Sequence, residues 1–307
     1  MKNTHITRRS ALLTGAGLSM TTMLPAAAPA QTARPATPGP AVTESLALGD
    51  FAVTPLLAGK VISDNPIATY ALNVDPAEFA RVCTDNFLPS AKSGNSFTPS
   101  LVKAGDALVL FDTGLNPEGI LAALAQAGVA PEAITHVVLT HMHGDHIGGL
   151  MGEGPTFPNA ELIVPRAEND YWAAQDNDAY KAKVLPLIGK ARQIGDSDEI
   201  LPGIRAEAAH GHTPGHTTYL LTSGEKQLLL SGDSFNHYVF SVAHPEWQVR
   251  FDADKEAAIQ TRKKVLERLA VDRIPFIGYH MPYPAVGFIS RRGEGYRFVP
   301  ATYQFAV

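Results

Sequence analysis

The spacing of hydrophobic positions changes repeatedly along the chain between the period of a strand and that of a helix. Short runs of β-branched and apolar residues predict strands at 51–62, 107–114, 136–140, 161–165, 204–210, 217–223, 226–233, 275–280, 285–290 and 296–303. Apolar residues at helical spacing predict helices from Pro117, near 167–175 and from about Asp254 to Val271. Strands mixed with helices in both halves indicate an α/β sandwich, with helices packed outside two sheets.

Residues 1–30 have the composition of an export signal. Lys2, Arg8 and Arg9 precede an apolar stretch that ends in small residues at 28–30, and no residue of the segment is acidic. Glycine, serine and threonine interrupt the stretch, so it is too weakly apolar for a bilayer span, and no membrane anchor is expected. The arginine pair resembles a twin-arginine signal, and a general secretory signal is the alternative. We therefore expect a periplasmic or secreted protein.

The folded domain is expected to begin near Leu46. Residues 31–45 are rich in proline, alanine and threonine without periodicity, as in a flexible lead-in, so one domain would occupy 46–307. Within it, the stretch from Asp64 to Ser96 has weak periodicity and several polar breaks. Two interpretations of this stretch stay open, a loop that covers the substrate and a part of a dimer contact.

Charge and cysteine content exclude some classes of protein. Cleavage after Ala30 would leave 22 Lys and Arg against 30 Asp and Glu, a net charge of −8. Such an acidic balance argues against nucleic-acid partners, which bind basic surfaces. The single cysteine, Cys83, excludes an internal disulfide and is expected to be a small buried hydrophobic residue.

Four residues that can bind metal follow the predicted strand at 136–140 within six positions: His141, His143, Asp145 and His146. Residues two apart in an extended stretch point the same way, so His141 and His143 can share one ion. Asp145 and His146, beyond the turn at Gly144, can face a second ion. Imidazole with carboxylate suits zinc and its first-row neighbours better than calcium or magnesium.

Further candidate ligands stand at the ends of three later strands. His210, His212 and His216 surround a tight turn after the strand at 204–210, and not all of them are needed. Asp233 ends one apolar strand and His280 another. Taken singly, Asp233 could cap a helix and His280 could be a hydrogen-bonded core histidine. Because four strand ends each deliver a ligand, a site for two metal ions is the better interpretation.

The H-x-H-x-D-H motif from His141 to His146 resembles the signature of the metallo-β-lactamase superfamily, and the resemblance covers nearly all of the chain after residue 30. It implies a single-domain αββα sandwich. It also implies a ligand set: His141, His143 and His212 for the first ion, Asp145, His146 and His280 for the second, and Asp233 as the bridge. Asp112 and His216 would support the ligands or their loops, whereas His210 and His237 match no ligand position.

Five phrases, THMHGDHIGGL, FPNAELIV, GHTPGHTTY, GYHMPYPAVGFI and GEGYRFVPATY, resemble the methyl parathion hydrolase group, which also contains quorum-quenching lactonases. The resemblance implies two divalent ions, zinc above all, with manganese, cobalt or iron as alternatives. Their bridging hydroxide would open a lactone or cleave an organophosphate triester. Asp145 and Asp233 would be the catalytic residues, with Asp145 also moving protons. A small ester, lactone or phosphotriester is the expected substrate, and a homodimer is an expected assembly.

Three alternative functions stay open. A zinc β-lactamase shares the export signal and the ligands, but commonly lacks a bridge such as Asp233. A glyoxalase-II-like thioesterase has matching ligands, but is more usually cytosolic and carries a C-terminal helical thiol-binding domain that is not obvious here. A non-catalytic zinc-binding module is disfavoured by the complete set of seven ligands.

Aromatic side chains are expected to shape the substrate pocket, because members of the group differ chiefly outside the metal ligands. The candidates are Phe97, Trp172, Phe235 and Tyr238. Each of these residue types is also common in hydrophobic cores.

Overall fold

The computed structural model describes residues 45–302. The export signal predicted at 1–30 and nearly all of the lead-in predicted at 31–45 lie outside these residues. Among the described helices, none is both long and apolar enough to cross a membrane.

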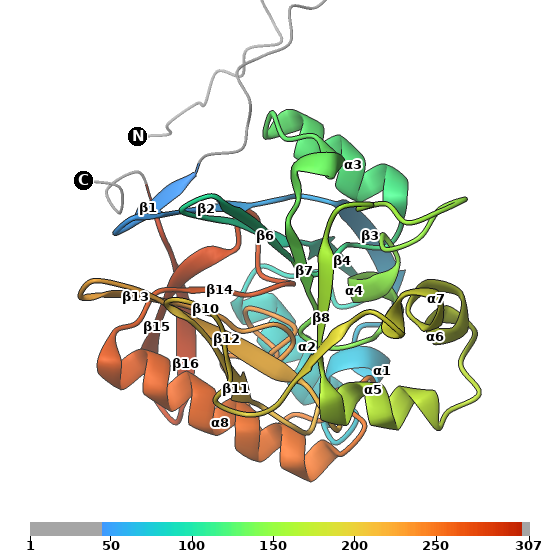
Figure 1. Cartoon of the computed structure of the whole chain (residues 1–307). Helices are drawn as coiled ribbons and strands as arrows, with labels where there is room; N and C mark the ends of the chain where they lie inside the picture. Colours follow the sequence, from blue (N-terminus) through green and yellow to red (C-terminus); the bar gives the residue numbers. More distant parts are fainter. Residues whose placement is uncertain (1–44, 303–307) are drawn as a thin grey trace, which may run out of the picture. The chain divides into compact units, whose positions relative to one another are not determined.

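Two seven-stranded sheets form the centre of the fold (Figure 1). In spatial order, the first consists of β1 (Leu46–Leu48), β2 (Phe51–Pro55), β5 (Ser100–Ala104), β6 (Ala107–Phe111), β7 (His136–Val138), β8 (Glu161–Pro165) and β9 (Arg192–Ile194). Its strands are antiparallel from β1 to β6 and parallel from β6 to β9. The carboxyl ends of these parallel strands share one edge of the sheet, where sites are commonly built.

The second sheet follows the order of the chain. It consists of β10 (Glu199–Leu201), β11 (Ile204–Ala208), β12 (Thr217–Ser223), β13 (Lys226–Leu230), β14 (Phe276–Ile277), β15 (Val286–Arg292) and β16 (Gly295–Pro300). Only the pair β13 and β14 is parallel within this sheet. The long segment between these two strands contains α8, so both strands again end on the same side.

Helices pack outside the two sheets, so the predicted αββα sandwich is confirmed. Helix α3 (Pro117–Gln126) covers the first sheet and the long helix α8 (Lys255–Asp272) covers the second (Figure 1). The other helical elements are α1 (Ile67–Tyr70), α2 (Pro76–Asp85), a 3-10 turn (Pro131–Ala133), α4 (Gly144–Ile147), α5 (Arg166–Ala173), α6 (Asp178–Lys183) and α7 (Leu185–Ile188).

Strand β6 shows how the sequence pattern produces the layers. Val109 and Phe111 belong to the core between the sheets, where the Phe111 ring lies 5.1 Å from that of Tyr219 on β12. Leu110, between them, belongs to a second core with Leu124 of α3. Since successive side chains of a strand point to opposite faces, a strand that is apolar throughout must be covered on both.

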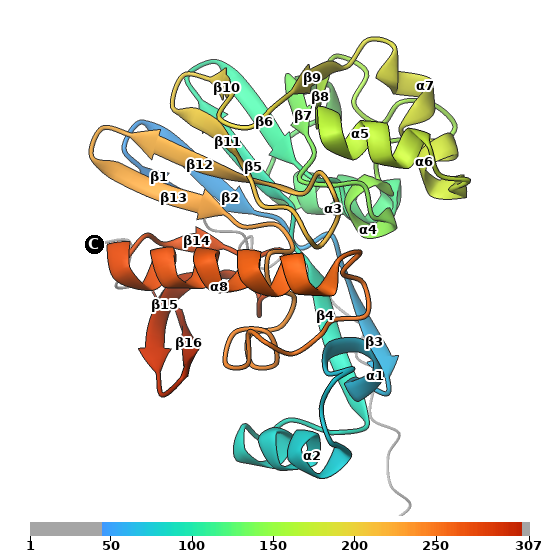
Figure 2. The same ribbon diagram turned by 90° about the horizontal axis from the view of Figure 1, so that it is seen from below.

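The stretch from Asp64 to Ser96 is a folded part of the protein rather than a loop. Strands β3 (Gly59–Asp64) and β4 (Lys92–Phe97) form a separate two-stranded sheet, and α1 and α2 lie between them in the chain. In Figure 2 these elements extend away from the two large sheets. Phe79 and Cys83 of α2 pack with Phe240 and Trp247 in an apolar cluster of their own. The prediction that Cys83 is buried is therefore confirmed.

Candidate metal centre

The predicted ligands lie on four loops, each beginning at the end of a strand. His141 follows β7, His212 follows β11, Asp233 follows β13 and His280 follows β14, each within four residues of the last strand residue. The first loop then turns into α4, whose first turn carries Asp145 and His146. The strand ends fix where each loop starts, and hydrogen bonds between the loops fix the positions of the side chains that they carry.

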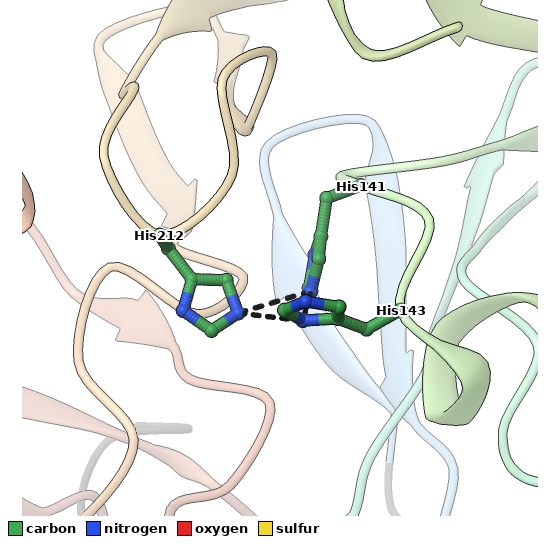
Figure 3. A group of neighbouring side chains, drawn as sticks. All are labelled: His141, His143 and His212. Carbon is green, nitrogen blue, oxygen red and sulfur yellow. Dashed lines mark hydrogen bonds between the residues drawn. The ribbon is translucent and has the colours of Figure 1, made fainter. Parts of the chain in front are cut away.

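Three imidazole rings converge in the first group of predicted ligands (Figure 3). His143 Nδ1 lies 3.1 Å from His141 Nε2 and 3.0 Å from His212 Nε2, and these two Nε2 atoms are 3.2 Å apart. The residues come from loops of the two different sheets, so only the folded sandwich brings them together. Three nitrogen atoms that face one point are the ligand arrangement of a tetrahedral zinc site.

The hydrogen-bond partners of His141 and His212 assign their tautomers. His212 Nδ1 donates to Asp252 Oδ1 at 2.8 Å. The Thr140 hydroxyl donates to Asp112 at 2.8 Å, so it accepts from His141 Nδ1 at 3.1 Å. Both Nε2 atoms consequently direct lone pairs at each other, an arrangement that repels unless a cation lies between them. This geometry fits a metal ion.

The second group combines imidazoles with carboxylates. Asp145 Oδ2 lies 3.6 Å from His146 Nε2 and 3.4 Å from His280 Nε2. Asp233 lies between the two groups: its Oδ2 is 3.1 Å from His280 Nε2 and 3.4 Å from His212 Nε2, and its Oδ1 is 3.3 Å from His146 Nε2. The structure thus brings all seven predicted ligands together, with Asp233 at the position expected of a bridge.

Two atoms of this cluster are buried without hydrogen-bond partners among the described residues: His146 Nε2 and Asp233 Oδ1. An unsatisfied polar atom costs about 1–3 kcal/mol when it is buried. His146 Nδ1 is 2.9 Å from Asp112 Oδ2, to which it donates, so its Nε2 is free to act as a ligand. The donor set therefore fits a second metal ion beside the first.

Charges within the cluster shift the ligand pKa values in different directions. Burial lowers the pKa of His143 to about 3, which keeps this imidazole neutral and able to coordinate. Burial also opposes protonation of His146, but the charges of Asp112 and two further carboxylates raise its pKa to about 10. Burial opposes ionisation of Asp145, but His146 and a second imidazole lower its pKa to about 2. Positive charge is thus favoured among these carboxylates, whether it comes from protons or from metal ions.

Asp112, in the sequence LFDTG, holds the loop that carries the first predicted ligands, the kind of supporting role that the family resemblance implied. Its carboxylate accepts hydrogen bonds from the Thr140 backbone N–H at 2.8 Å and from the side chains of Thr140 and His146. Gly148 and Gly149 at the end of α4 allow this loop to approach its neighbour closely. A Cβ atom on either residue would lie within about 2.2 Å of a backbone oxygen.

His216 is buried and supports the cluster without joining it. Its Nδ1 donates to the Ala209 carbonyl at 3.0 Å, and its Nε2 accepts from the Asp233 backbone N–H at 2.9 Å. Because both ring nitrogens are engaged in hydrogen bonds, the imidazole positions Asp233 and does not coordinate a metal ion. His210 is exposed, and His237 is buried with its Nδ1 accepting two backbone N–H groups.

Glu168 ties two ligand loops together and was missed by the sequence analysis. Its buried carboxylate accepts from the Met142 N–H at 2.9 Å and from Trp172 Nε1 at 2.5 Å. It also accepts from the Thr213 hydroxyl at 2.7 Å and the Gly215 N–H at 3.0 Å. An acidic residue in the first turn of a helix is ordinary, since it complements the helix dipole, so nothing in the sequence marks Glu168 as buried.

Asp252 and Arg262 form a second unforeseen support. The Arg262 guanidinium is fully buried and donates to Asp252 Oδ2 at 2.8 Å, and Asp252 in turn fixes His212. Arg262 also donates to the carbonyls of Pro245 and Trp247 at 2.9 Å. It lies on α8, so this chain of hydrogen bonds connects the outer helix to the first group of ligands. The only sequence signal was a basic residue at a core-facing helical position.

A cavity of about 460 Å³ opens above the cluster. Its floor consists of His143, Asp145, His212, Asp233 and His280. Its wall consists of Val61, Ser63, Asn95 and Phe97 from the β3–β4 sheet, Thr69 and Tyr70 from α1, and Leu115, Asn236 and Phe251 from loops. A larger cavity of about 750 Å³ lies between Val137, Phe157 and Leu187 and includes none of the predicted ligands.

The aromatic predictions have mixed outcomes. Phe97 lines the cavity, and its ring lies 5.4 Å from that of His280. Phe235 was predicted wrongly, because it is buried in the main core against Phe276. Tyr238 lines a different cavity. Trp172 is not among the described residues that line the cavity above the cluster, since its indole lies against His143 and donates to Glu168.

Comparison with known protein families agrees with this geometry. Residues 98–275 match the family described as the metallo-beta-lactamase superfamily, and this match includes six of the seven predicted ligands. The chain belongs to the metallo-beta-lactamase superfamily. The predicted resemblance at the level of the superfamily is thereby confirmed. His280 alone lies beyond the matched segment, on the loop after β14.

Individual relatives include lactonases. An N-acyl homoserine lactonase from Bacillus sp is 32% identical over 164 residues, which are 52% of this chain and 61% of the lactonase. The solved structure of AidC, a dizinc quorum-quenching lactonase in complex with its product N-hexanoyl-L-homoserine, is similar with a TM-score of 0.78 and 27% identity. The matched region covers 85% of this chain and 98% of AidC. The hydrolase AbOPH has the same TM-score and coverage at 21% identity, which shows a shared fold.

Proposed function

We propose that this protein is a metal-dependent hydrolase that opens lactone rings, with N-acyl homoserine lactones as the leading substrate class. The observation that carries the proposal is the convergence of seven histidine and aspartate side chains beneath a cavity large enough for a small molecule. The similarity to lactonases, one of them a dizinc enzyme, supports the choice of substrate and of zinc.

His141, His143 and His212 would hold one ion, and Asp145, His146 and His280 the other, with Asp233 shared between them. When bound, two such ions lower the pKa of water and withdraw electrons from a carbonyl or phosphoryl oxygen. The residues around them hold the imidazoles in one tautomer and orientation. In the mechanism that we propose, Asp112 and Asp252 accept from the ring N–H groups of His146 and His212, and Glu168 ties the ligand loops together.

Asp145 has a second role in the proposed reaction, the transfer of a proton. Ring opening adds water across the ester: the water oxygen bonds to the carbonyl carbon, the ring C–O bond breaks, and one water proton ends on the released alcohol. The Asp145 carboxylate lines the cavity and its side chain is 23% exposed, in contrast to the 4% of Asp233. It is therefore the acid of the cluster best placed to carry this proton to the departing oxygen.

The lining of the cavity favours a neutral substrate with an apolar portion. Val61, Leu115 and Phe251 are exposed at its wall, and no lysine or arginine is among the described lining residues. An N-acylated lactone has a neutral ring and an apolar acyl chain. Substrates with carboxylates, such as β-lactams or glutathione thioesters, would find no lysine or arginine among the described lining residues to pair with.

An organophosphate triester remains the second candidate, because it is also neutral and is attacked by the same chemistry. The sequence phrases shared with the methyl parathion hydrolase group favour it. The two candidates separate in one experiment, which compares kcat/KM of the purified, metal-quantified protein on N-hexanoyl homoserine lactone, a δ-lactone, methyl parathion and nitrocefin. A kcat/KM for the lactones far above that for methyl parathion would support our proposal. A kcat/KM for methyl parathion far above that for the lactones would identify a phosphotriesterase instead, and turnover of nitrocefin alone would contradict both candidates.

Export is a separate proposal. We infer from the composition of residues 1–30 that they direct the protein to the periplasm or the medium, by the twin-arginine route. Mass spectrometry of the protein recovered from a cell fractionation would test it. An intact N-terminus on protein confined to the cytoplasm would contradict export. A homodimer, also proposed, would be detected by light scattering.

A further inference from the structure

One face of the β3–β4 sheet forms a wall of the cavity. Val61 and Ser63 of β3 and Asn95 and Phe97 of β4 all line it. Val61 pairs directly with Asn95 across the two strands. Since alternate residues of a strand point to the same side, the strand register itself fixes Asn95 on the cavity side.

The Asn95 amide is held in one orientation by Tyr70. The Tyr70 hydroxyl donates to Asn95 Oδ1 at 2.7 Å. Tyr70 is buried, its ring packs 5.6 Å from that of Phe240, and burial raises the pKa of its hydroxyl, so it remains a donor. With Oδ1 directed at Tyr70, the amide N–H groups point away from it. Among the described residues, no acceptor for the Asn95 side-chain amide occurs.

Strand β4 is attached to the candidate metal centre directly beside Asn95. The Ser96 carbonyl accepts from His280 Nδ1 at 3.0 Å, and the Ser96 hydroxyl donates to the Met281 carbonyl at 3.0 Å. The Phe97 ring also contacts His280. A strand rises about 3.3 Å per residue, so Asn95 lies about 6–7 Å along β4 from Phe97, towards the exposed Val61 at the wall.

These positions match two parts of one substrate. A lactone carbonyl at the floor, beside His280, places the ring carbon that carries the acylamino group further up the wall. We propose that Asn95 determines specificity by donating an N–H to the carbonyl oxygen of this acylamino group, and that Tyr70 is a positioning residue that orients the Asn95 amide. The inference rests on the proposed lactonase function and adds to it the group that the enzyme recognises beyond the ring.

The test compares two lactones that differ in this group. Asn95→Ala is measured with N-hexanoyl homoserine lactone and with γ-butyrolactone, which has no acylamino substituent. The ratio of kcat/KM for the acylated lactone to that for γ-butyrolactone should fall about 3- to 10-fold, the effect of one lost neutral hydrogen bond, mainly through KM. Binding of the ring-opened product N-hexanoyl-homoserine, measured by calorimetry, should weaken by a similar factor.

Two further variants separate recognition from folding. Asn95→Asp keeps the shape and the acceptor for Tyr70 but has no N–H to donate, so it should lower the ratio at least as much. Tyr70→Phe should lower it less, again through KM, because the amide is retained but free to rotate. Lys92→Ala is the matched control: it lies on the same strand, faces the other side and loses only an exposed ion pair with Asp64.

The outcomes are distinct. Wild-type protein that opens both lactones, together with Asn95 variants that leave the ratio and product binding at wild-type values, would overturn this inference alone. Equal losses on both lactones would also overturn it, since they indicate a structural role. Wild-type protein that opens neither lactone would overturn the proposed function, and this inference with it.

Discussion

The floor and the wall of the cavity are built by different forces. The floor is a polar network in which buried carboxylates fix predicted ligands, Asp112 for His146 and Asp252 for His212. The wall is a small sheet beside the short helix α1, whose Tyr70 packs in an apolar cluster with Phe79, Phe240 and Trp247. Directional hydrogen bonds fix positions closely, whereas apolar packing accepts substitutions of similar volume.

This difference indicates how the molecule divides its tasks. A change in the floor should alter metal binding and catalysis together, because every ligand position depends on another. A change in the wall should alter which substrate binds while the metal content remains the same. Variants of each region can therefore show whether the two tasks are separate.

The largest effect is expected at the proposed bridge. Replacing Asp233 by Ala removes the proposed ligand shared between the two groups, whose carboxylate oxygens lie 3.1 Å from His280 Nε2 and 3.3 Å from His146 Nε2. Hydrolysis should fall about 1,000-fold and metal content should fall with it. Kinetics and elemental analysis of the same sample measure both. Two bound ions with full activity in this variant would refute a bridge, and His210→Ala, on an exposed histidine, is the control.

A large effect on stability is expected where the two ligand loops are joined. The two carboxylate oxygens of Glu168 accept four hydrogen bonds, and Glu168→Gln leaves only one oxygen to accept them. Its amide N–H groups would then face donors such as the Gly215 N–H and the Thr213 hydroxyl. The free energy of unfolding should fall by about 3 kcal/mol. Urea denaturation measures it, with the exposed Glu153→Gln as control. A free energy of unfolding equal to that of the control would show that interactions other than those of Glu168 hold the two loops together.

A smaller effect, on metal affinity, is expected at Asp252, the hydrogen-bond partner of His212. Asp252→Asn keeps an acceptor for His212 but turns an amide N–H towards the buried Arg262. Zinc affinity should fall about 10- to 100-fold, as is typical when a partner of a ligand is changed. Competition with a chelator measures the affinity, and Asp106→Asn on an exposed turn is the control. Unchanged affinity would make Asp252 a partner of Arg262 alone.

The smallest effect is expected in the wall. Phe251→Ala removes an exposed aromatic surface from the cavity edge. KM for a long-chain N-acyl homoserine lactone should rise about 2- to 5-fold with the metal content constant. Phe87→Ala, on an exposed phenylalanine outside the cavity lining, should leave KM as in the wild type. Loss of metal from the Phe251 variant would mean that floor and wall are not independent.

The floor could be predicted from sequence because its chemistry is concentrated in short motifs. His141, His143, Asp145 and His146 stand together, and the period of the preceding strand places them at a sheet edge. The supports of the floor were harder to find. Asp112 belongs to a motif, but Glu168 and Asp252 are single acids, and the loop residues that they hold, such as Met142 and His212, lie 26 or more positions away.

The wall could hardly be predicted, because its elements gain their stability from each other. The segment from Asp64 to Ser96 shows weak periodicity since its helices pack on an irregular stretch around Phe240 rather than on a sheet. Phe235 and Tyr238 were predicted to line the pocket because they are aromatic, and both stand shortly after Asp233 in the sequence. The chain turns after Asp233 and buries Phe235 in the main core, whereas Asn236 lines the cavity. Proximity in sequence to a ligand did not determine the side on which a side chain lies.

The most direct test of the whole account is a zinc titration of the metal-stripped protein, with bound metal and hydrolysis of N-hexanoyl homoserine lactone measured in the same samples. We predict negligible activity without metal and a rise that reaches its maximum when two ions are bound per chain. Full activity in the metal-stripped protein, or a maximum with no ion retained, would contradict a binuclear metal-dependent hydrolase.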